Sequence, residues 1–536
     1  MSDAVGDLKR ALNADSRLNV HILAGLVRAA LRASPKETRA LLQSAYERAL
    51  REAFQSSNAD SVAEVATIGA MVLAAVGDQK GAIARLDQAL SMAPTAPTAR
   101  AQILGARAGY YALEGDRDNA ESSLSDAREQ AVSGLPIEAQ LDLETDAAVV
   151  GLLFLDPAQI DDAVNVISAA RASDLDWLAS SLMVFYITGV MAQGNHQRAS
   201  AWSEALAGYA AASDHPARAL DATVAQLALR ARSVVVEIPR ELDERGLETF
   251  NHNALWRLRV LAVYGPAVAG QPSLAREACA RLDELVPLMN NTFSQTSAGY
   301  AALVNALFEQ ERVDALLPVP PHPATLTALG GALAAAEATA IAGAQSRAAD
   351  WLAWLETELP TEVVTSLEWP SCRARVEGLL LLRLGREREA VGRLQDGIRC
   401  CEEGRNPIQA SIGQVQLAEA LLRGTRASLL PASRLRLLGK AGAEELRRLG
   451  CDPVLFAYAA SRTFLRDERL PERGGLTRRE AQVLGRLAKG MSYREIGLEL
   501  GINSRTVGVH ASHCYEKLGV RNRVEAVEVA RELSIV

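Results

Sequence analysis

The chain has 536 residues, too many for one ordinary hydrophobic core, so two or more domains are expected. Hydrophobic residues make up 49% and charged residues 23%, which excludes a wholly disordered chain. The net charge of −8 is unevenly distributed, because residues 474–536 carry ten Lys and Arg against seven Asp and Glu. A cationic end on an acidic body is expected where that end meets phosphate groups.

The sequence shows no sign of a membrane span, a disulfide framework or a zinc site. Its most apolar stretch, residues 326–344, is interrupted by Glu337. The six cysteines are scattered without C-x-x-C spacing, which is typical of reduced thiols in a reducing compartment. We therefore expect a cytoplasmic protein that does not contact membranes. Cys400 and Cys401 are neighbours on an expected helix and should point in different directions, but a redox-sensing pair stays open as an alternative.

A repeated pattern of small and large apolar residues runs through much of the chain. It places apolar residues at helical spacing before a glycine and then opens a second amphipathic segment with an alanine. The clearest copy consists of Ala108, Tyr111, Gly115, Asp116, Ala120, Leu124 and Ala127. Other copies run from Ala70 to Ala89 and from Gly378 to Gly397, with fainter ones around Gly194, Gly270 and Gly343. Each copy predicts two closely packed helices separated by the glycine.

These copies resemble tetratricopeptide repeats, which have small and large residues at the same spacings. Because the glycines are 38 to 42 residues apart, we expect a tetratricopeptide-like superhelix with longer loops than the family ideal. The resemblance implies a concave surface that binds peptides or protein segments. It would bring four side chains toward that groove, unless they are ordinary solvated positions: Arg257, Tyr264, Glu337 and Arg375.

We expect an all-α fold divided into four parts. Residues 318–323 (PVPPHP) cannot be helical, and they are expected to separate two lobes of the repeat array, residues 1–317 and 324–455. A linker over residues 456–473 then precedes a C-terminal domain, residues 474–536. No long segment has the period of a β-strand, although residues 233–238 (SVVVEI) are rich in β-branched side chains.

Capping residues predict four short helices in the C-terminal domain. The caps are Thr477 with Glu480, Ser492 with Glu495, Asn503, and Asn522 with Glu525. The inner face is expected to hold Val483, Leu484, Leu487, Ile496, Leu500, Ile502, Val507 and Leu518. Gly490 should end the first helix, and Gly501 should provide the sharp turn after the second. The second and third helices then form a helix-turn-helix, whose second member lies in the major groove of DNA.

The C-terminal domain resembles the LuxR/NarL-type helix-turn-helix family over its full length. The matching residues are Leu476, Thr477, Arg479, Glu480, Val483, Leu484, Gly490, Ser492, Glu495, Ile496, Leu500, Ile502, Thr506, Val507, His510, Lys517, Leu518, Val520, Arg523, Ala526 and Val527. The resemblance implies that Glu480 and Lys517 tie helices together. It also implies that the last helix can form a dimer seam, for which Val527, Ala530 and Leu533 are candidates unless they pack on the domain's own core.

The DNA-binding residues follow from the same resemblance. We expect them to be Arg494, Asn503, Ser504, Arg505, Thr506, Gly508, Val509, Ser512, Arg521 and Arg523. Arg494 and Thr506 would contact phosphate, and Val509 would offer only an apolar contact, for instance to a thymine methyl group. The family usually has Lys where this chain has Gly508 and Ile where it has Cys514. The missing lysine shifts the expected contacts toward the arginines.

We interpret the chain as a DNA-binding transcription regulator whose repeat array senses a protein, peptide or small ligand and gates the C-terminal domain. The expected partners are double-stranded DNA, RNA polymerase or another protein or peptide, and a second copy of the chain. No P-loop, phosphoacceptor domain or catalytic constellation occurs in the sequence, so we expect neither an enzyme nor a cofactor. The alternative is an interaction scaffold or antagonist with a degenerate helix-turn-helix.

Overall fold

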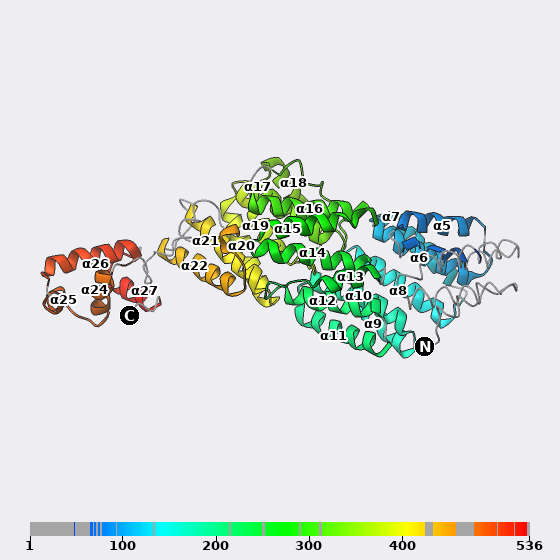
Figure 1. Cartoon of the computed structure of the whole chain (residues 1–536), viewed down its shortest axis with the longest axis horizontal. Helices are drawn as coiled ribbons and strands as arrows, with labels where there is room; N and C mark the ends of the chain where they lie inside the picture. The colour runs from blue at the N-terminus through cyan, green and yellow to red at the C-terminus, as the bar shows by residue number, and fades with distance from the viewer. Residues whose placement is uncertain are drawn as a thin grey trace.

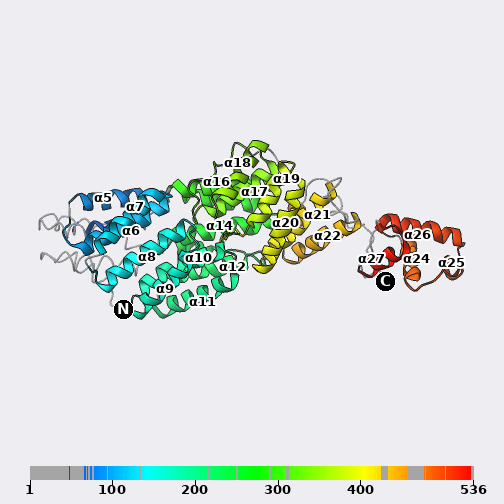
Figure 2. The same ribbon diagram turned by 180° about the vertical axis from the view of Figure 1, so that it is seen from behind.

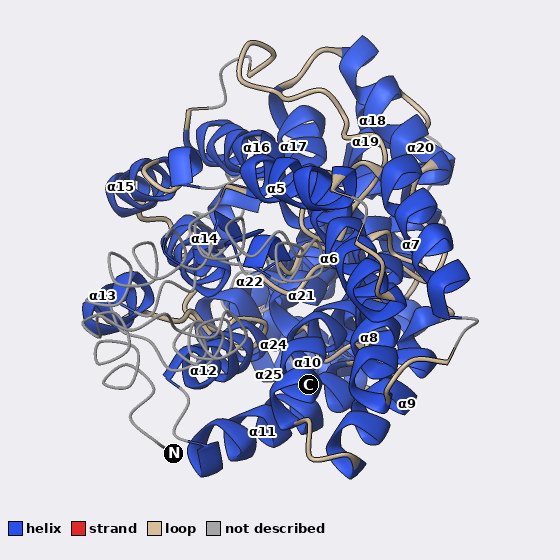
Figure 3. Cartoon of the chain, turned by 90° about the vertical axis from the view of Figure 1, so that its right-hand side faces the viewer, coloured by secondary structure: helices blue, strands red, loops and turns tan. Residues whose placement is uncertain are grey.

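The computed structural model is a series of α-helices joined by loops (Figure 3). It describes residues 48, 65–67, 69–70, 73–74, 78–92, 94–131, 134–213, 216–248, 252–288, 291–309, 313–423, 432–456, 476, 478–500, 502–518 and 520–532. No strand occurs in these ranges, and the β-branched residues 233–238 lie in a turn and an irregular loop. The predicted all-α fold is confirmed for this part of the chain.

The array runs from blue to orange along one elongated body (Figures 1 and 2). Its helices are α5 (Gln79–Ser91), α6 (Pro97–Glu114), α7 (Arg117–Ala131), α8 (Ile137–Leu153), α9 (Gln159–Ala172), α10 (Asp176–Ala192), α11 (His196–Ser213), α12 (Pro216–Arg230), α13 (Arg240–Glu248), α14 (His252–Val268), α15 (Pro272–Asp283), α16 (Asn291–Phe308), α17 (Leu329–Ala342), α18 (Gln345–Thr357), α19 (Arg373–Arg383), α20 (Glu387–Glu403), α21 (Pro407–Arg423) and α22 (Ala432–Arg448). Short 3₁₀ helices lie at η1 (Val286–Leu288) and η2 (Pro453–Phe456). Among the described residues, none of the helices combines the length and apolar character that a membrane crossing needs.

Consecutive helices pack as the repeat pattern predicts. Gly115 separates α6 from α7 with a φ of +80°, and Gly385 separates α19 from α20 with a φ of +77°. Side chains with a Cβ rarely adopt this left-handed conformation, so glycine is favoured where the helix must stop. Ala120 on α7 and Ala390 on α20 are fully buried, which lets each second helix approach the first. At Gly343 the outcome differs, because its φ is −82° and α17 ends in an extended residue.

The array has a continuous core over its described part. One cluster of buried apolar side chains reaches from Leu104 on α6 to Phe456 in η2. Residues 318–323 are not helical, as their prolines require, yet α16 and α17 pack directly against each other across this connection. Stacked helix pairs stabilise one another through such shared apolar surface.

The four side chains expected at a concave groove are instead buried or nearly so, and neither the groove nor the solvated interpretation is correct for them. Glu337 on α17 and Arg375 on α19 form an ion pair of 2.6 Å, with both side chains at most 4% exposed. Gln409 and Gln416 of α21 accept two further hydrogen bonds from Arg375, at 2.8 and 3.0 Å. Satisfying every arm of the guanidinium allows a charge to be buried between three helices.

Arg257 and Tyr264, the other two of these side chains, both lie on α14. Arg257 is paired with Glu368 at 2.6 Å. Tyr264 is buried against Trp369, with the two ring centroids 5.1 Å apart. Both side chains therefore face the interior. Neighbouring loops and helices cover the side of α14 that the repeat pattern predicted would line a groove.

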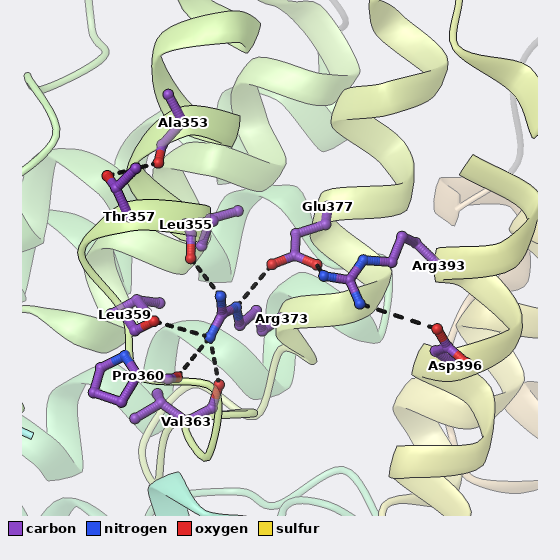
Figure 4. A network of polar contacts seen from close by, with 10 residues as sticks. All are labelled: Ala353, Leu355, Thr357, Leu359, Pro360, Val363, Arg373, Glu377, Arg393 and Asp396. Atoms are coloured by element: carbon purple, nitrogen blue, oxygen red, sulfur yellow. Dashed lines mark hydrogen bonds and ion pairs between the residues drawn. The ribbon is translucent and has the colours of Figure 1, made fainter. Parts of the chain in front are cut away.

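Arg373 joins the end of α18 to the start of α19 (Figure 4). Its guanidinium donates to the carbonyls of Leu355, Leu359, Pro360 and Val363 and to the Glu377 carboxylate. Glu377 is 1% exposed and also pairs with Arg393 of α20 at 2.7 Å. Leu355 lies in the last turn of α18, where carbonyls have no partner inside the helix, and the other three carbonyls lie in the loop that follows. The arginine thus satisfies acceptors that neither the helix nor the loop satisfies through its own backbone.

The C-terminal domain has four short helices. They are α24 (Arg478–Ala488), α25 (Tyr493–Leu500), α26 (Ser504–Leu518) and α27 (Arg523–Glu532). Helix α26 packs on the three others. The four predicted helices are confirmed, while Thr477 and Gly501 lie outside the described residues.

Candidate nucleic-acid interface

A capping box begins α25. The Ser492 hydroxyl accepts a hydrogen bond from the Glu495 N–H at 3.3 Å, and the Glu495 carboxylate accepts one from the Ser492 N–H at 2.7 Å. The bonds from Ser492 lower the pKa of Glu495. Because both backbone donors are satisfied locally, the first turn of α25 is held in one geometry.

Asn503 caps α26, the helix expected to enter the groove. Its side-chain oxygen accepts hydrogen bonds from the Thr506 N–H at 2.7 Å and the Thr506 hydroxyl at 2.9 Å. The cap orients the N-terminal turn, whose positive dipole faces outward with Ser504 and Arg505. Both Asn503 and Thr506 are thereby engaged with each other in the free protein.

The turn between α25 and α26 depends on a glycine that the sequence analysis did not single out. The Ile502 N–H donates to the Gly497 carbonyl at 2.9 Å. A Cβ on Gly497 would lie 2.6 Å from the Ile502 carbonyl oxygen, which is closer than atoms can approach. Only glycine allows the chain to fold back so tightly here. A glycine inside a short amphipathic helix is the sequence signal for such an approach.

The caps of α27 are also as predicted. The Asn522 side chain accepts from the Glu525 N–H at 3.0 Å and donates to the Glu525 carboxylate at 2.7 Å. Glu525 also accepts from the Arg521 N–H at 2.9 Å. These local hydrogen bonds fix the backbone just before α27. The Arg521 side chain takes no part in them and is exposed.

The inner face of the domain matches the prediction closely. Six of the expected side chains are buried, and Leu500 and Ile502 are partly buried at the turn. On α26 the buried positions are Val507, Ala511, Cys514 and Leu518, which follow the helical 3-4 spacing. Burial raises the pKa of the Cys514 thiol to about 12. The opposite stripe of α26 is consequently the one free to meet a partner.

Arg505, Val509 and Ser512 are exposed on that outer stripe, with Gly508 half-buried between them. A Cβ on Gly508 would be 3.7 Å from the Tyr493 ring, an ordinary contact distance. The missing side chain therefore reflects no steric demand of the fold. Position 508 can carry a larger residue toward the same outer face.

A shallow, open cavity of about 850 Å³ lies between the N-terminal ends of α25 and α26. It is lined by Ser492, Tyr493, Arg494, Ser504, Arg505 and Arg523. Of these, Ser492 and Tyr493 were not among the predicted site residues. Three arginines around one concave surface create the positive potential that attracts phosphate groups.

Arg523 has a structural role as well. Its guanidinium donates to the Leu487 carbonyl at 2.8 Å, near the end of α24. Because one N–H group of its guanidinium is bonded inside the domain, Arg523 has fewer donors available to a partner than Arg494 or Arg505. Val527 and Ala530, the candidates for a dimer seam on α27, pack on the domain's own clusters. Leu533 lies outside the described residues.

The polar residues of the described region do not form a metal centre. No set of three or more His, Cys, Asp or Glu side chains among these residues is arranged to hold a metal ion. The exposed groups of the described part of the C-terminal domain include arginines, hydroxyl groups and the N-terminus of α26. Such groups bind phosphate and read base edges.

Two short helices joined by a tight turn, with the second exposing a cationic N-terminal end, define a helix-turn-helix DNA-binding domain. Residues 475–530 match the model of the bacterial regulatory proteins of the luxR family. The chain therefore carries a C-terminal DNA-binding domain of the LuxR family, as its sequence pattern predicted.

Known regulators share this similarity over a short segment. The transcriptional regulatory protein UhpA of Escherichia coli (strain K12) is 54% identical over 50 residues, which are 9% of this chain and 26% of UhpA. The HTH-type transcriptional regulator MalT of Vibrio cholerae is 43% identical over 58 residues, or 11% of this chain and 6% of MalT. The chain thus matches about a quarter or less of the length of these relatives.

Proposed function

We propose that the protein is a cytoplasmic transcription regulator that binds double-stranded DNA with α26 in the major groove. The observation that carries this proposal is the outer stripe of α26, where Arg505, Val509 and Ser512 are exposed beside the cationic cavity. Arg505 would bond a base edge, and Val509 would contact a thymine methyl group. Arg494 and Arg521 would hold phosphates on either side.

The residues at the N-terminal end of α26 have a supporting role in this proposal. Asn503, Ser504 and Thr506 would place the N-terminal turn of α26 against the DNA backbone. Gly508 would bring the helix close to the bases without a contact of its own. Arg523 would contribute its remaining N–H groups while keeping its bond to the Leu487 carbonyl.

The helical array would act as the sensor and gate. We retain the division into lobes 1–317 and 324–455, a linker at 456–473 and the DNA-binding domain at 474–536. A cavity of about 530 Å³ between the start of α7, the end of α18 and the proline segment offers one place for a peptide or small ligand. Arg117, Phe154 and the pair His322–Glu358, 2.9 Å apart, line it.

Protein partners form the last part of the proposal. RNA polymerase or another protein would bind the array. A second copy of the chain would have to use the exposed residues of α27, of which Val524 is 76% exposed. The charge distribution favours DNA binding by the C-terminal domain and protein binding by the array. The acidic array would repel DNA, whereas the cationic domain would attract it.

The test is selection of duplex sites from a random pool by the full-length protein, followed by titration at several salt concentrations. We expect one enriched sequence family, and a binding constant that falls steeply with salt as counterions are released. Equal and weak affinity for selected and random duplexes would reject the proposal. It would favour the alternative of a scaffold or antagonist with a degenerate helix-turn-helix.

A further inference from the structure

Tyr493 is the first residue of α25, and its aromatic ring lies against α26. A Cβ on Gly508 would lie 3.7 Å from the ring atom Cε2 and 3.8 Å from Cδ2, so the ring covers α26 where that helix has no side chain. The Tyr493 hydroxyl lies 3.4 Å from the hydroxyl of Tyr515, which is two turns further along α26. These two contacts hold the Tyr493 side chain beside the helix.

The Tyr493 side chain also reaches the surface of the domain. It is 38% exposed, and it lines the cationic cavity together with three arginines. Core packing does not account for a large aromatic residue at this surface, because Ile496 and Gly497 form the buried side of α25. A phenol carries a hydroxyl group that can donate one hydrogen bond and accept others. Tyr493 therefore adds an aromatic hydroxyl to the cavity.

Tyr515 is the donor in the hydrogen bond between the two hydroxyl groups. Its side chain is half-buried and packs against the apolar clusters of the domain, so it has fewer alternative partners than the exposed Tyr493. Burial and the hydrogen bond to Tyr493 both raise the pKa of Tyr515, as expected for a hydroxyl that keeps its proton and donates it. The positive charge of Arg523 opposes this rise, which places its guanidinium near the same hydroxyl groups. The Tyr493 oxygen thus accepts from Tyr515, and its own O–H can donate outward.

We propose that the Tyr493 hydroxyl donates a hydrogen bond to a phosphate group of bound DNA, and that Tyr515 is the positioning residue that orients it. This inference rests on the proposed function and adds a contact to it. Arg523 would contact the same phosphate through the N–H groups that remain beside its bond to the Leu487 carbonyl. Hydrogen bonds to a charged oxygen are stronger than those between neutral groups. Tyr493 thereby supplies a phosphate donor on the side of α26 where Gly508 has no side chain.

A hydroxyl donor differs from an arginine in one measurable respect. Each phosphate that a Lys or Arg side chain neutralises releases counterions, and this release makes the affinity depend on salt. A hydroxyl group is uncharged and neutralises no phosphate. The Tyr493 contact therefore contributes to the affinity for DNA without contributing to its salt dependence.

The test measures binding of the full-length protein to the selected duplex by fluorescence anisotropy at several salt concentrations. Tyr493→Phe removes only the hydroxyl and keeps the ring over Gly508. We expect about tenfold weaker binding, with the same number of released counterions as for the unmodified protein. Tyr515→Phe should weaken binding by about threefold, and it should have no further effect when Tyr493→Phe is already present. Tyr209→Phe on α11 of the array is the matched control and should bind as the unmodified protein does.

A second measurement identifies the phosphate. Single methylphosphonate substitutions along both strands of the duplex replace one charged phosphate oxygen at a time by a methyl group. At one phosphate, we expect the substitution to weaken binding of the unmodified protein and to have a clearly smaller effect on Tyr493→Phe. At the other phosphates, each substitution should affect the two proteins by the same factor.

The outcomes separate this inference from the proposed function. Unchanged binding by Tyr493→Phe would overturn the inference, as would weaker binding with no phosphate at which the two proteins respond differently. Additive effects of Tyr493→Phe and Tyr515→Phe would reject the positioning role of Tyr515. In these cases the unmodified protein still prefers its selected duplex, so the proposed function stands. If the unmodified protein prefers no duplex, the proposed function fails and this inference fails with it.

Discussion

The ammonium group of Lys517 on α26 donates hydrogen bonds to both carboxylate oxygens of Glu480 on α24, at 2.9 and 2.7 Å. Glu480 is 3% exposed, so the pair fixes the angle at which α26 crosses the rest of the domain. The pair thereby also sets the direction of the exposed stripe of α26, which we propose to face DNA.

The first prediction concerns this pair. Lys517→Met removes both hydrogen bonds that Lys517 donates to the buried Glu480 carboxylate, and it should lower the free energy of unfolding of the C-terminal domain by about 1–3 kcal/mol. The loss is smaller than for a fully buried pair because Lys517 is partly exposed. Urea denaturation followed by circular dichroism checks this. Lys489→Met, at an exposed position after α24, is the matched control and should change stability by at most about 0.5 kcal/mol. Equal effects of the two variants would contradict the role of the pair.

The second prediction concerns DNA affinity. Arg505→Ala should weaken binding to the selected duplex by about 1–3 kcal/mol, roughly 5- to 150-fold in affinity. Its effect on binding to random duplex should be smaller. Arg494→Ala should weaken binding to both duplexes by the same factor. It should also reduce the number of counterions released on binding, measured from the salt dependence of the affinity, by about one. Arg531→Ala removes a charge from the exposed end of α27 and serves as the control in fluorescence-anisotropy titrations. An Arg505→Ala protein that keeps its preference would show that α26 does not read the bases.

The third prediction is a gain in affinity for DNA. Gly508→Lys should increase affinity for DNA, because the position has room beside Tyr493 and its side chain would face the groove. Gly508→Ala separates the two effects of the change. It should stabilise α26 by about 1 kcal/mol without a comparable gain in affinity. If the lysine and alanine variants bind equally, position 508 does not face phosphate.

The fourth prediction concerns the buried network of the array. Arg375→Leu leaves the buried Glu337 carboxylate without its ion-pair partner, although the Ser371 hydroxyl still donates to it. The change should cost about 3–5 kcal/mol, with a clear drop in the Tm of the array. Arg399→Leu on α20 removes an arginine that is 69% exposed and paired with Asp396, and it should cost at most about 1 kcal/mol. Differential scanning calorimetry of the full-length variants measures both. A small effect of Arg375→Leu would show that water can replace the guanidinium there.

The fifth prediction is a pH dependence. Bonds from Ser492 hold the pKa of Glu495 below its usual 4.5 in the folded domain. The folded-state pKa is then lower than the unfolded one, so this stabilisation is complete above the unfolded pKa and is lost as the pH falls through the folded pKa. The stability difference between the unmodified domain and Glu495→Gln should therefore shrink between about pH 5 and pH 3. A difference that stays constant over this range would exclude the carboxylate as its source.

The C-terminal domain was largely predictable because its signals are local. A capping box such as Ser492 with Glu495 involves residues three positions apart, and the buried stripe of α26 follows the helical period. The repeat glycines act in the same way, since Gly115 ends a helix through its own backbone conformation. Even so, the close approach at Gly497 escaped notice, because its reason lies across the turn at Ile502.

Tertiary structure decided everything that depends on residues distant in sequence. Arg375 and Glu337 were expected at a groove, but three helices close around them, and no periodicity within one helix reveals which neighbours will cover it. The buried cluster that contains Cys372 and Cys401 likewise exists only because α19 and α20 pack side by side. Local sequence thus determined where helices begin, end and turn their apolar faces, while the pairing of buried charges and the burial of thiols required the packing of the whole array.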